Sequence, residues 1–143
     1  MSFLLDTNVV SELRKSPGRV DARVRAWVAS RDVSSLHLSA ITIMEIEIGI
    51  GRLERRDQIQ ADRLRTWLDD AVLAAFAGRI LPVDLAVARR VARLHVPDPR
   101  PERDAMIAAT ATVHGLTVVT RNVADFESLD VALVDPWSVP ADD

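Results

Sequence analysis

Cysteine is absent from the sequence, and lysine occurs only once, at Lys15. Without cysteine the chain can form no disulfide bond, thiolate metal site or cysteine nucleophile. Long apolar runs are absent too, because the segment Ala71–Ala77 is far shorter than the about 20 residues that a membrane-spanning helix needs. No basic segment precedes an apolar one at the amino terminus, so we expect no secretory signal. These absences predict a cytoplasmic protein with no membrane partner.

The composition that remains is that of an ordinary folded domain. The 143 residues are 48% hydrophobic and 27% charged, which is enough to fill a core and to keep the surface wet. We therefore expect one domain over residues 1–143, with a core at about residues 3–135. The net charge of −3 counts against a generic binder of polyanions. Of the 18 cationic residues 17 are arginines (18 − 1), which suit phosphates, although we take genomic base composition as the main cause.

Short apolar segments alternate with segments of helical periodicity along the chain. Strands are expected at residues 3–5, 34–39, 79–83, 116–120 and 131–134. Helices are expected at residues 9–15, 20–28, 40–56, 64–75, 85–92 and 105–112. This alternation, with strands that are apolar throughout, predicts an α/β fold whose parallel sheet is covered by helices on both faces. In such folds ligands gather at the carboxyl ends of the strands.

Four acidic residues fall near the ends of expected strands or the starts of expected helices: Asp6, Glu45, Asp104 and Asp125. Each has an ordinary structural explanation when it is taken alone. Asp6 is a suitable helix cap, Asp104 favours a first helical turn through the helix dipole, and Asp125 suits a turn. Four carboxylates crowded at one edge would repel one another, and a hard divalent cation such as Mg²⁺ or Mn²⁺ would relieve that repulsion. The spacing alone leaves open whether the four converge.

Glu45 depends on where its helix begins. If Thr42 is the cap, Thr-x-x-Glu forms a capping box and Glu45 is a structural residue. If Ser39 is the cap, Glu45 lies in the second turn and is free to point at the other acids. Glu47 faces largely away from Glu45 on a helix and is expected in solvent.

Four motifs in a fixed order resemble those of the PIN-domain toxins of bacterial VapBC-type toxin–antitoxin pairs, especially their FitB-like branch. They span residues 5–126, nearly the whole chain, and as an ordered set they are highly specific. The motifs are Leu-Asp-Thr-Asn-Val-Val-Ser-Glu at 5–12, Thr-Ile-Met-Glu at 42–45, Asp-Ala-Met-Ile-Ala-Ala-Thr-Ala at 104–111 and Thr-Arg-Asn-Val-Ala-Asp-Phe at 120–126.

The resemblance implies a three-layer α/β/α sandwich around a parallel sheet and metal-dependent cleavage of RNA phosphodiester bonds. It implies that Asp6 and Asp104 are the principal Mg²⁺ ligands and that Glu45 completes the acidic cluster. Some relatives carry an acid where this chain has Asn122, so either Asp125 supplies the fourth carboxylate here or the metal binds more weakly. Either Glu45 or Asp125 would act as the general base.

Further roles follow from the same resemblance. The polar side chains around the acids are expected to bind substrate: Thr7, Asn8, Thr120 and Asn122. The expected partners are an RNA substrate and a cognate antitoxin, whose helix or tail lies in a groove of the toxin, and the toxin is expected to form a homodimer.

Two other functions compete with the ribonuclease. A catalytically silent PIN-like domain could serve as a binding module in a regulatory complex, but retention of all four acids argues against it. A phosphatase with an aspartate nucleophile needs a second aspartate two residues after the first, and this chain has Asn8 there.

Overall fold

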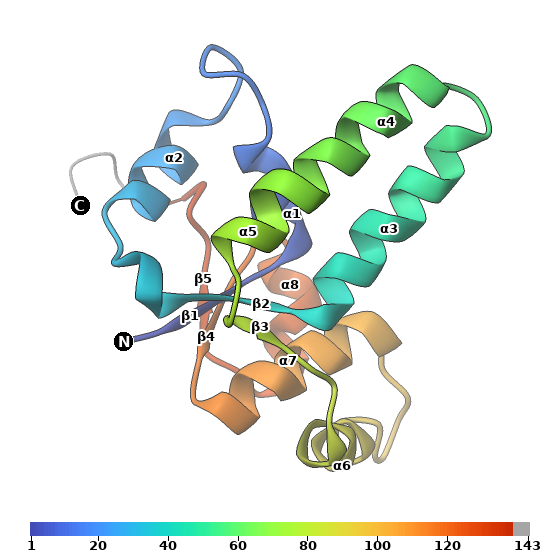
Figure 1. Cartoon of the computed structure of the whole chain (residues 1–143). Helices are drawn as coiled ribbons and strands as arrows, with labels where there is room; N and C mark the ends of the chain where they lie inside the picture. Colours follow the sequence, from blue (N-terminus) through green and yellow to red (C-terminus); the bar gives the residue numbers. More distant parts are fainter. Residues whose placement is uncertain (139–143) are drawn as a thin grey trace.

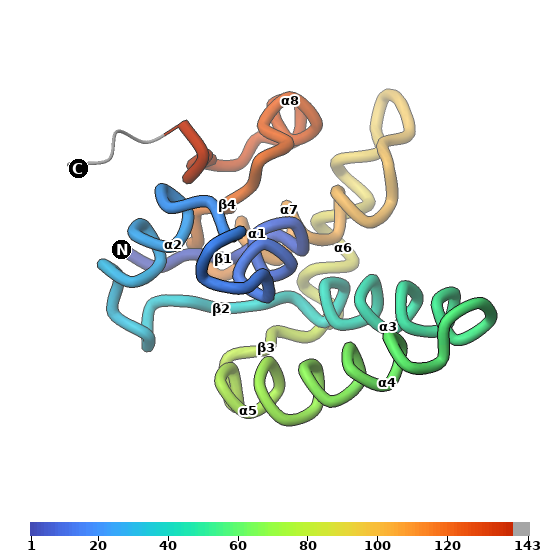
Figure 2. Tube along the Cα trace, turned by 90° about the horizontal axis from the view of Figure 1, so that it is seen from above, coloured from blue at the N-terminus to red at the C-terminus, as the bar shows by residue number. Residues whose placement is uncertain are grey.

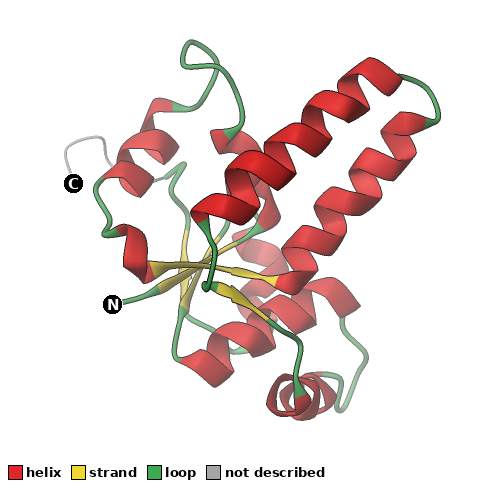
Figure 3. Ribbon diagram, viewed as in Figure 1, coloured by secondary structure: helices red, strands yellow, loops and turns green. Residues whose placement is uncertain are grey.

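The structure is a computed structural model that describes residues 1–138. A five-stranded sheet with the order β3-β2-β1-β4-β5 runs through its centre, and every strand pair is parallel (Figure 3). The strands are β1 (Phe3–Leu5), β2 (Leu36–Ser39), β3 (Ile80–Leu81), β4 (Thr117–Val119) and β5 (Leu133–Val134). The predicted parallel α/β fold is confirmed, and the last strand lies at the sheet edge as expected.

Helices fill most of the segments between the strands (Figure 1). They are α1 (Thr7–Leu13), α2 (Ala22–Ala29), α3 (Ala40–Glu54), α4 (Gln58–Thr66), α5 (Leu73–Ala75), α6 (Leu85–Leu94), α7 (Glu102–His114) and α8 (Val123–Phe126). A π-helical segment, Trp67–Val72, joins α4 to α5, so the stripe expected at 64–75 is one helical rod with a π turn inside it. No helix within residues 1–138 is long and apolar enough to cross a membrane.

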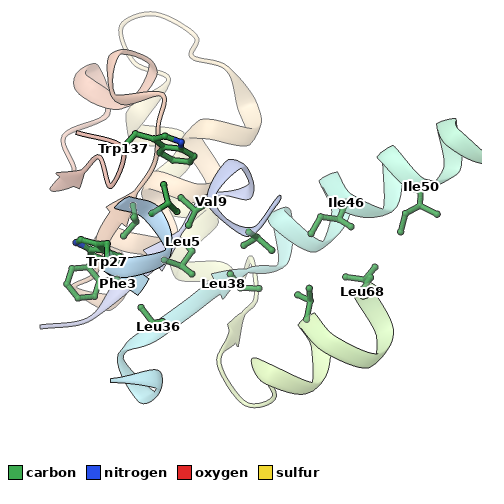
Figure 4. Close-up of a cluster of buried hydrophobic side chains, with 14 of the residues drawn as sticks. Phe3, Leu5, Val9, Trp27, Leu36, Leu38, Ile46, Ile50, Leu68 and Trp137 are labelled. Carbon is green, nitrogen blue, oxygen red and sulfur yellow. The ribbon is translucent and has the colours of Figure 1, made fainter. Parts of the chain in front are cut away.

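Two hydrophobic clusters lie on opposite faces of the sheet, because successive side chains of a strand point to opposite faces. Phe3 and Leu5 of β1 join the cluster that packs under α1 to α5 (Figure 4). Leu4, between them, joins the second cluster, which packs against α7 and α8. The sheet is therefore the middle layer of a three-layer α/β/α sandwich, as the resemblance implies.

The hairpin of α3 and α4 extends beyond the sheet (Figures 1 and 2). Its two helices pack along each other, and buried Ile50 of α3 and Ala61 of α4 belong to the first cluster. An open groove of about 460 Å³ lies between this hairpin and α1, and Thr7, Glu45, Ile50 and Trp67 are among the residues that line it.

Several predicted boundaries were wrong by a few residues. The first helix begins at Thr7 and not at residue 9, because Asp6 caps it. The second strand begins at Leu36, because Asp32 accepts the backbone N–H of Ser34 at 3.2 Å and starts a 3₁₀ turn there. The third strand covers only Ile80–Leu81 and is shorter than the predicted range of 79–83.

Candidate active site

Asp6 lies where the central strand β1 meets α1, at the carboxyl edge of the sheet. Its backbone N–H donates to the carbonyl of Val119 on β4 at 2.9 Å, which fixes the two strand ends side by side. Its carboxylate accepts the Thr7 N–H at 2.8 Å and the Thr120 hydroxyl at 2.7 Å. Only 6% of Asp6 is exposed.

Burial raises the pKa of Asp6 above its usual value, and the charges of Glu45 and Asp125 raise it further. The hydrogen bonds from Thr120 and Thr7 oppose this effect because they stabilise the ionised carboxylate. Asp6 is thus the helix cap expected from the sequence, and its pKa also responds to the charges of Glu45 and Asp125.

A polar network surrounds the end of β4. The Asn8 amide donates to the Thr120 hydroxyl oxygen at 3.2 Å, and its oxygen accepts the backbone N–H of Arg121 at 3.3 Å. The backbone N–H of Asn122 also donates to the Thr120 hydroxyl oxygen, at 3.0 Å. Thr120 is fully buried, whereas Asn122 is exposed. The β4–α8 loop is therefore tied to the start of α1 by side chains from both.

Glu45 reaches the same edge from α3. Ser39 is the cap of α3, since its hydroxyl accepts the backbone N–H of Ile41 at 3.0 Å, so the capping-box alternative is wrong. Glu45 therefore lies in the second turn, where it accepts the Thr7 hydroxyl at 2.7 Å. Glu47 is exposed and pairs with Arg65, as expected of a solvated residue.

Asp104 is the third residue of α7 and lies in its first turn. Partial burial raises its pKa to about 6, and the charges of Asp6, Asp125 and Glu45 add to the effect. No hydrogen bond from the described part of the chain lowers it. The structure thus brings Asp104 into the electrostatic range of the other three acids.

Asp125 is an exposed residue of the short helix α8 and raises the pKa of both Asp6 and Asp104. The acids are close enough for their charges to raise the pKa values of Asp6 and Asp104, but they do not form a closed cage around one ion. Within residues 1–138 no three or more carboxylate or histidine side chains are close enough to hold one metal ion together.

Two residues at this edge were missed by the sequence analysis. Arg103 places a guanidinium nitrogen 3.7 Å from a Glu45 carboxylate oxygen. The buried Thr42 lies with its hydroxyl oxygen 3.1 Å from that of Thr7. The position of Arg103 next to Asp104 in the sequence was a usable signal. Thr42 opens the Thr-Ile-Met-Glu motif, but it was considered only as a helix cap and not as a residue of the site.

Fold and site define a class of protein: three-layer α/β/α sandwiches with acidic residues at the carboxyl edge of a parallel sheet. The model of the PIN domain family matches residues 3–131. The chain belongs to the PIN domain family, and the resemblance drawn from its four motifs is confirmed.

Two relatives can be aligned with this chain over almost its whole length. Toxin FitB of Neisseria gonorrhoeae is 41% identical, over 94% of this chain and 98% of that protein. VapC ribonuclease Y4jK of Sinorhizobium fredii is 38% identical, over 94% of this chain and 97% of that protein. The crystal structure of FitAcB from Neisseria gonorrhoeae is similar with a TM-score of 0.84 and 39% identity, over 96% of this chain and 99% of that one.

Proposed function

We propose that the protein is the toxin of a toxin–antitoxin pair and that it hydrolyses RNA phosphodiester bonds as a Mg²⁺-dependent endoribonuclease, with Mn²⁺ as a substitute. The observation that carries the proposal is that, at the carboxyl edge of the sheet, the charges of Glu45 and Asp125 add to burial in raising the pKa values of Asp6 and Asp104. Full-length relatives named as a toxin and as a ribonuclease support it.

The donor set suits a hard divalent cation, because every acid supplies oxygen and the pKa values of Asp6 and Asp104 are raised by burial and further by negative neighbours. Mg²⁺ usually keeps several waters and takes only one or two carboxylates directly. An open acidic edge therefore fits it better than a closed cage would. Asp6 and Asp104 would hold the ion, with Glu45 and Asp125 completing the cluster.

When bound, the cation would neutralise the carboxylates, polarise the phosphoryl oxygen and favour deprotonation of the attacking water. The protein's own residues position these groups. Thr7 and Thr120 donate hydroxyl hydrogens to Glu45 and Asp6, which fixes the direction of both carboxylates. Either Glu45 or Asp125 takes the proton of the water as general base.

Asn8 and Asn122 complete the substrate-binding set together with Thr7 and Thr120. The exposed Asn122 side chain makes no hydrogen bond within residues 1–138, so its amide can donate to an RNA phosphate. Asn8 bridges Thr120 and Arg121, and in this role it holds the loop that carries Asn122.

A cognate antitoxin is the proposed protein partner. The groove that Thr7 and Glu45 share with Ile50 and Trp67 offers an apolar wall beside the acids, which suits a helix or tail with a basic end. The net charge of −3 favours a basic partner segment. We further propose that the toxin forms a homodimer and acts in the cytoplasm, where its RNA substrate lies.

The deciding experiment is cleavage of a panel of structured RNAs by purified, antitoxin-free protein. Reactions with Mg²⁺, with Mn²⁺ and with EDTA are run beside the Asp6→Asn variant. We expect cutting that requires the metal and is lost in the variant. Absence of cutting by the wild type would favour the silent binding module, and cutting that persists in the variant would indicate a contaminant.

A further inference from the structure

Two arginines flank the acidic edge on opposite sides of Asp6. In the sheet, β1 lies between β2 and β4, so the residues that follow these three strands are arranged in the same order. Arg103 lies on the β2 side, because it contacts Glu45 of the helix that follows β2. Arg121 lies on the β4 side, since it directly follows Thr120 and donates its backbone N–H to the side-chain oxygen of Asn8.

Arg103 keeps hydrogen-bonding capacity for another acceptor. Its 3.7 Å contact with Glu45 is longer than the about 2.7–2.9 Å of a charge-assisted hydrogen bond. The side chain of Arg103 is 46% exposed, and a guanidinium carries about five N–H donors. A phosphate at this position can therefore take the donors that Glu45 leaves unused.

Arg121 is held in place by an aromatic ring. Its guanidinium carbon lies 5.2 Å from the centre of the Trp137 ring, and Trp137 is buried. In the described part of the chain no carboxylate lies within 4.0 Å of the Arg121 nitrogens. A cation that contacts a ring in this way keeps its N–H fork available for two phosphate oxygens.

We propose that Arg103 and Arg121 bind the RNA backbone on the two sides of the phosphate that is cut, and so position it over the acids. This inference rests on the proposed ribonuclease function and adds two substrate-positioning residues to it. An edge with four carboxylates repels a polyanion, and the overall charge of −3 supplies no general attraction. Cations on both sides of Asp6 offset that repulsion where the backbone must enter and leave.

The first test measures binding without cleavage. Fluorescence anisotropy of a fluorescein-labelled single-stranded oligouridylate is followed in EDTA from about 50 to about 200 mM NaCl. We expect Arg103→Gln and Arg121→Gln each to weaken binding and to reduce the slope of log K against log salt by about 0.7, the value for one phosphate contact on a single strand. The double variant should lose about 1.4.

Matched variants separate this role from charge in general and from folding. Arg103→Lys and Arg121→Lys keep the charge and should keep the slope. Arg25→Gln removes an exposed arginine on α2, which packs on α1, and should leave the slope unchanged. Unchanged slopes in both glutamine variants would overturn the proposal, and so would an equal loss in Arg25→Gln.

The second test uses an RNA that the wild type cuts. We expect each glutamine variant to raise KM by about fivefold to tenfold with a smaller change in kcat, because it loses a charged hydrogen bond at an exposed site. A neutral methylphosphonate next to the cut should raise the wild-type KM but add nothing in the variant that has lost its contact. If every methylphosphonate raises KM by the same factor in each glutamine variant as in the wild type, the assignment is refuted. If the wild type cuts no RNA, the salt slopes still decide whether the arginines bind phosphates, and only the proposed function fails.

Discussion

Replacing Asp104 with asparagine should stabilise the metal-free protein above about pH 6 and abolish RNA cleavage. Partial burial and the charges of Asp6, Asp125 and Glu45 raise the pKa of Asp104 from 3.8 to about 6. The ionised carboxylate is therefore less favourable in the folded chain than in the unfolded chain. Asparagine keeps the size of the side chain and removes the charge.

The sign and size of the effect follow from the two pKa values. Because the folded-state pKa is the higher one, Asp104 contributes stability that is complete below pH 3.8 and is lost as the pH rises through about 6. A rise from 3.8 to about 6 corresponds to about 3 kcal/mol, at about 1.36 kcal/mol per pH unit. Solvent screens this partly exposed group, and the helix dipole favours aspartate by about 0.3–1 kcal/mol. We therefore expect the variant to gain about 1 kcal/mol at neutral pH.

Urea unfolding in EDTA measures this gain. The midpoint of Asp104→Asn should exceed that of the wild type at about pH 7.5 and approach it at about pH 4.5, with the same m-value. Asp98→Asn removes an exposed acid from the loop before α7 and should show no such pH-dependent gain. Added Mg²⁺ should raise the wild-type midpoint more than that of Asp104→Asn, because a ligand stabilises the state that binds it.

Two results would refute the reasoning at different points. An Asp104→Asn variant that is less stable than the wild type at about pH 7.5 would show that the acids do not repel Asp104 enough to matter. A variant that is stabilised as expected but cleaves RNA at the wild-type rate would support the electrostatic argument and show that cleavage does not need Asp104. Neither result depends on which RNA is the natural target.

Two further substitutions probe the frame of the site. Thr120→Val removes the hydroxyl that donates to Asp6 at 2.7 Å; it should lower the free energy of unfolding by about 1–3 kcal/mol and slow cleavage, while Thr117→Val at the start of β4 should do neither. Gly115 ends α7 with φ of 67°, so Gly115→Ala should cost about 1 kcal/mol in urea unfolding, whereas Gly51→Ala within α3, where an added Cβ meets nothing within 4 Å, should gain about 1 kcal/mol. Equal effects of the two hydroxyl losses, or the same sign for both glycine replacements, would contradict these assignments.

The sequence predicted where strands and helices alternate along the chain and the edge at which polar residues gather, because both follow from local patterns and from the rule for parallel sheets. An apolar run followed by Asp6 indicates a buried strand that ends at a helix cap, and the structure has both. Parallel pairing then brings Asp6 next to Thr120 although 114 residues separate them. The rule that parallel strands end on one side places both residues at the same edge, and the pairing of β1 with β4 brings them into contact.

The contacts between hydroxyls and carboxylates could not be predicted in this way. The Thr7 hydroxyl meets Glu45 only because α1 packs against α3, and the two residues are 38 positions apart. The choice between Ser39 and Thr42 as the cap depends on where the strand before the helix stops. That point is set by pairing in the sheet, where Ser39 is held opposite Leu81. Local propensity contains neither piece of information.

The acids at this edge differ in how the protein stabilises their charge, and the difference suggests where a binder acts. Asp6 has three hydrogen-bond donors, from Thr7, Asn8 and Thr120, and Glu45 has the Thr7 hydroxyl with Arg103 nearby. Asp104 has the helix N-terminus but no hydrogen-bond donor from the described part of the chain, and its pKa is raised to about 6. An added positive charge lowers the free energy most at the carboxylate that the fold stabilises least. Under the proposed function, a metal ion and a basic side chain of an antitoxin would therefore compete for the same neighbourhood of Asp104, and the partner would inhibit the enzyme by supplying the charge that the fold leaves out.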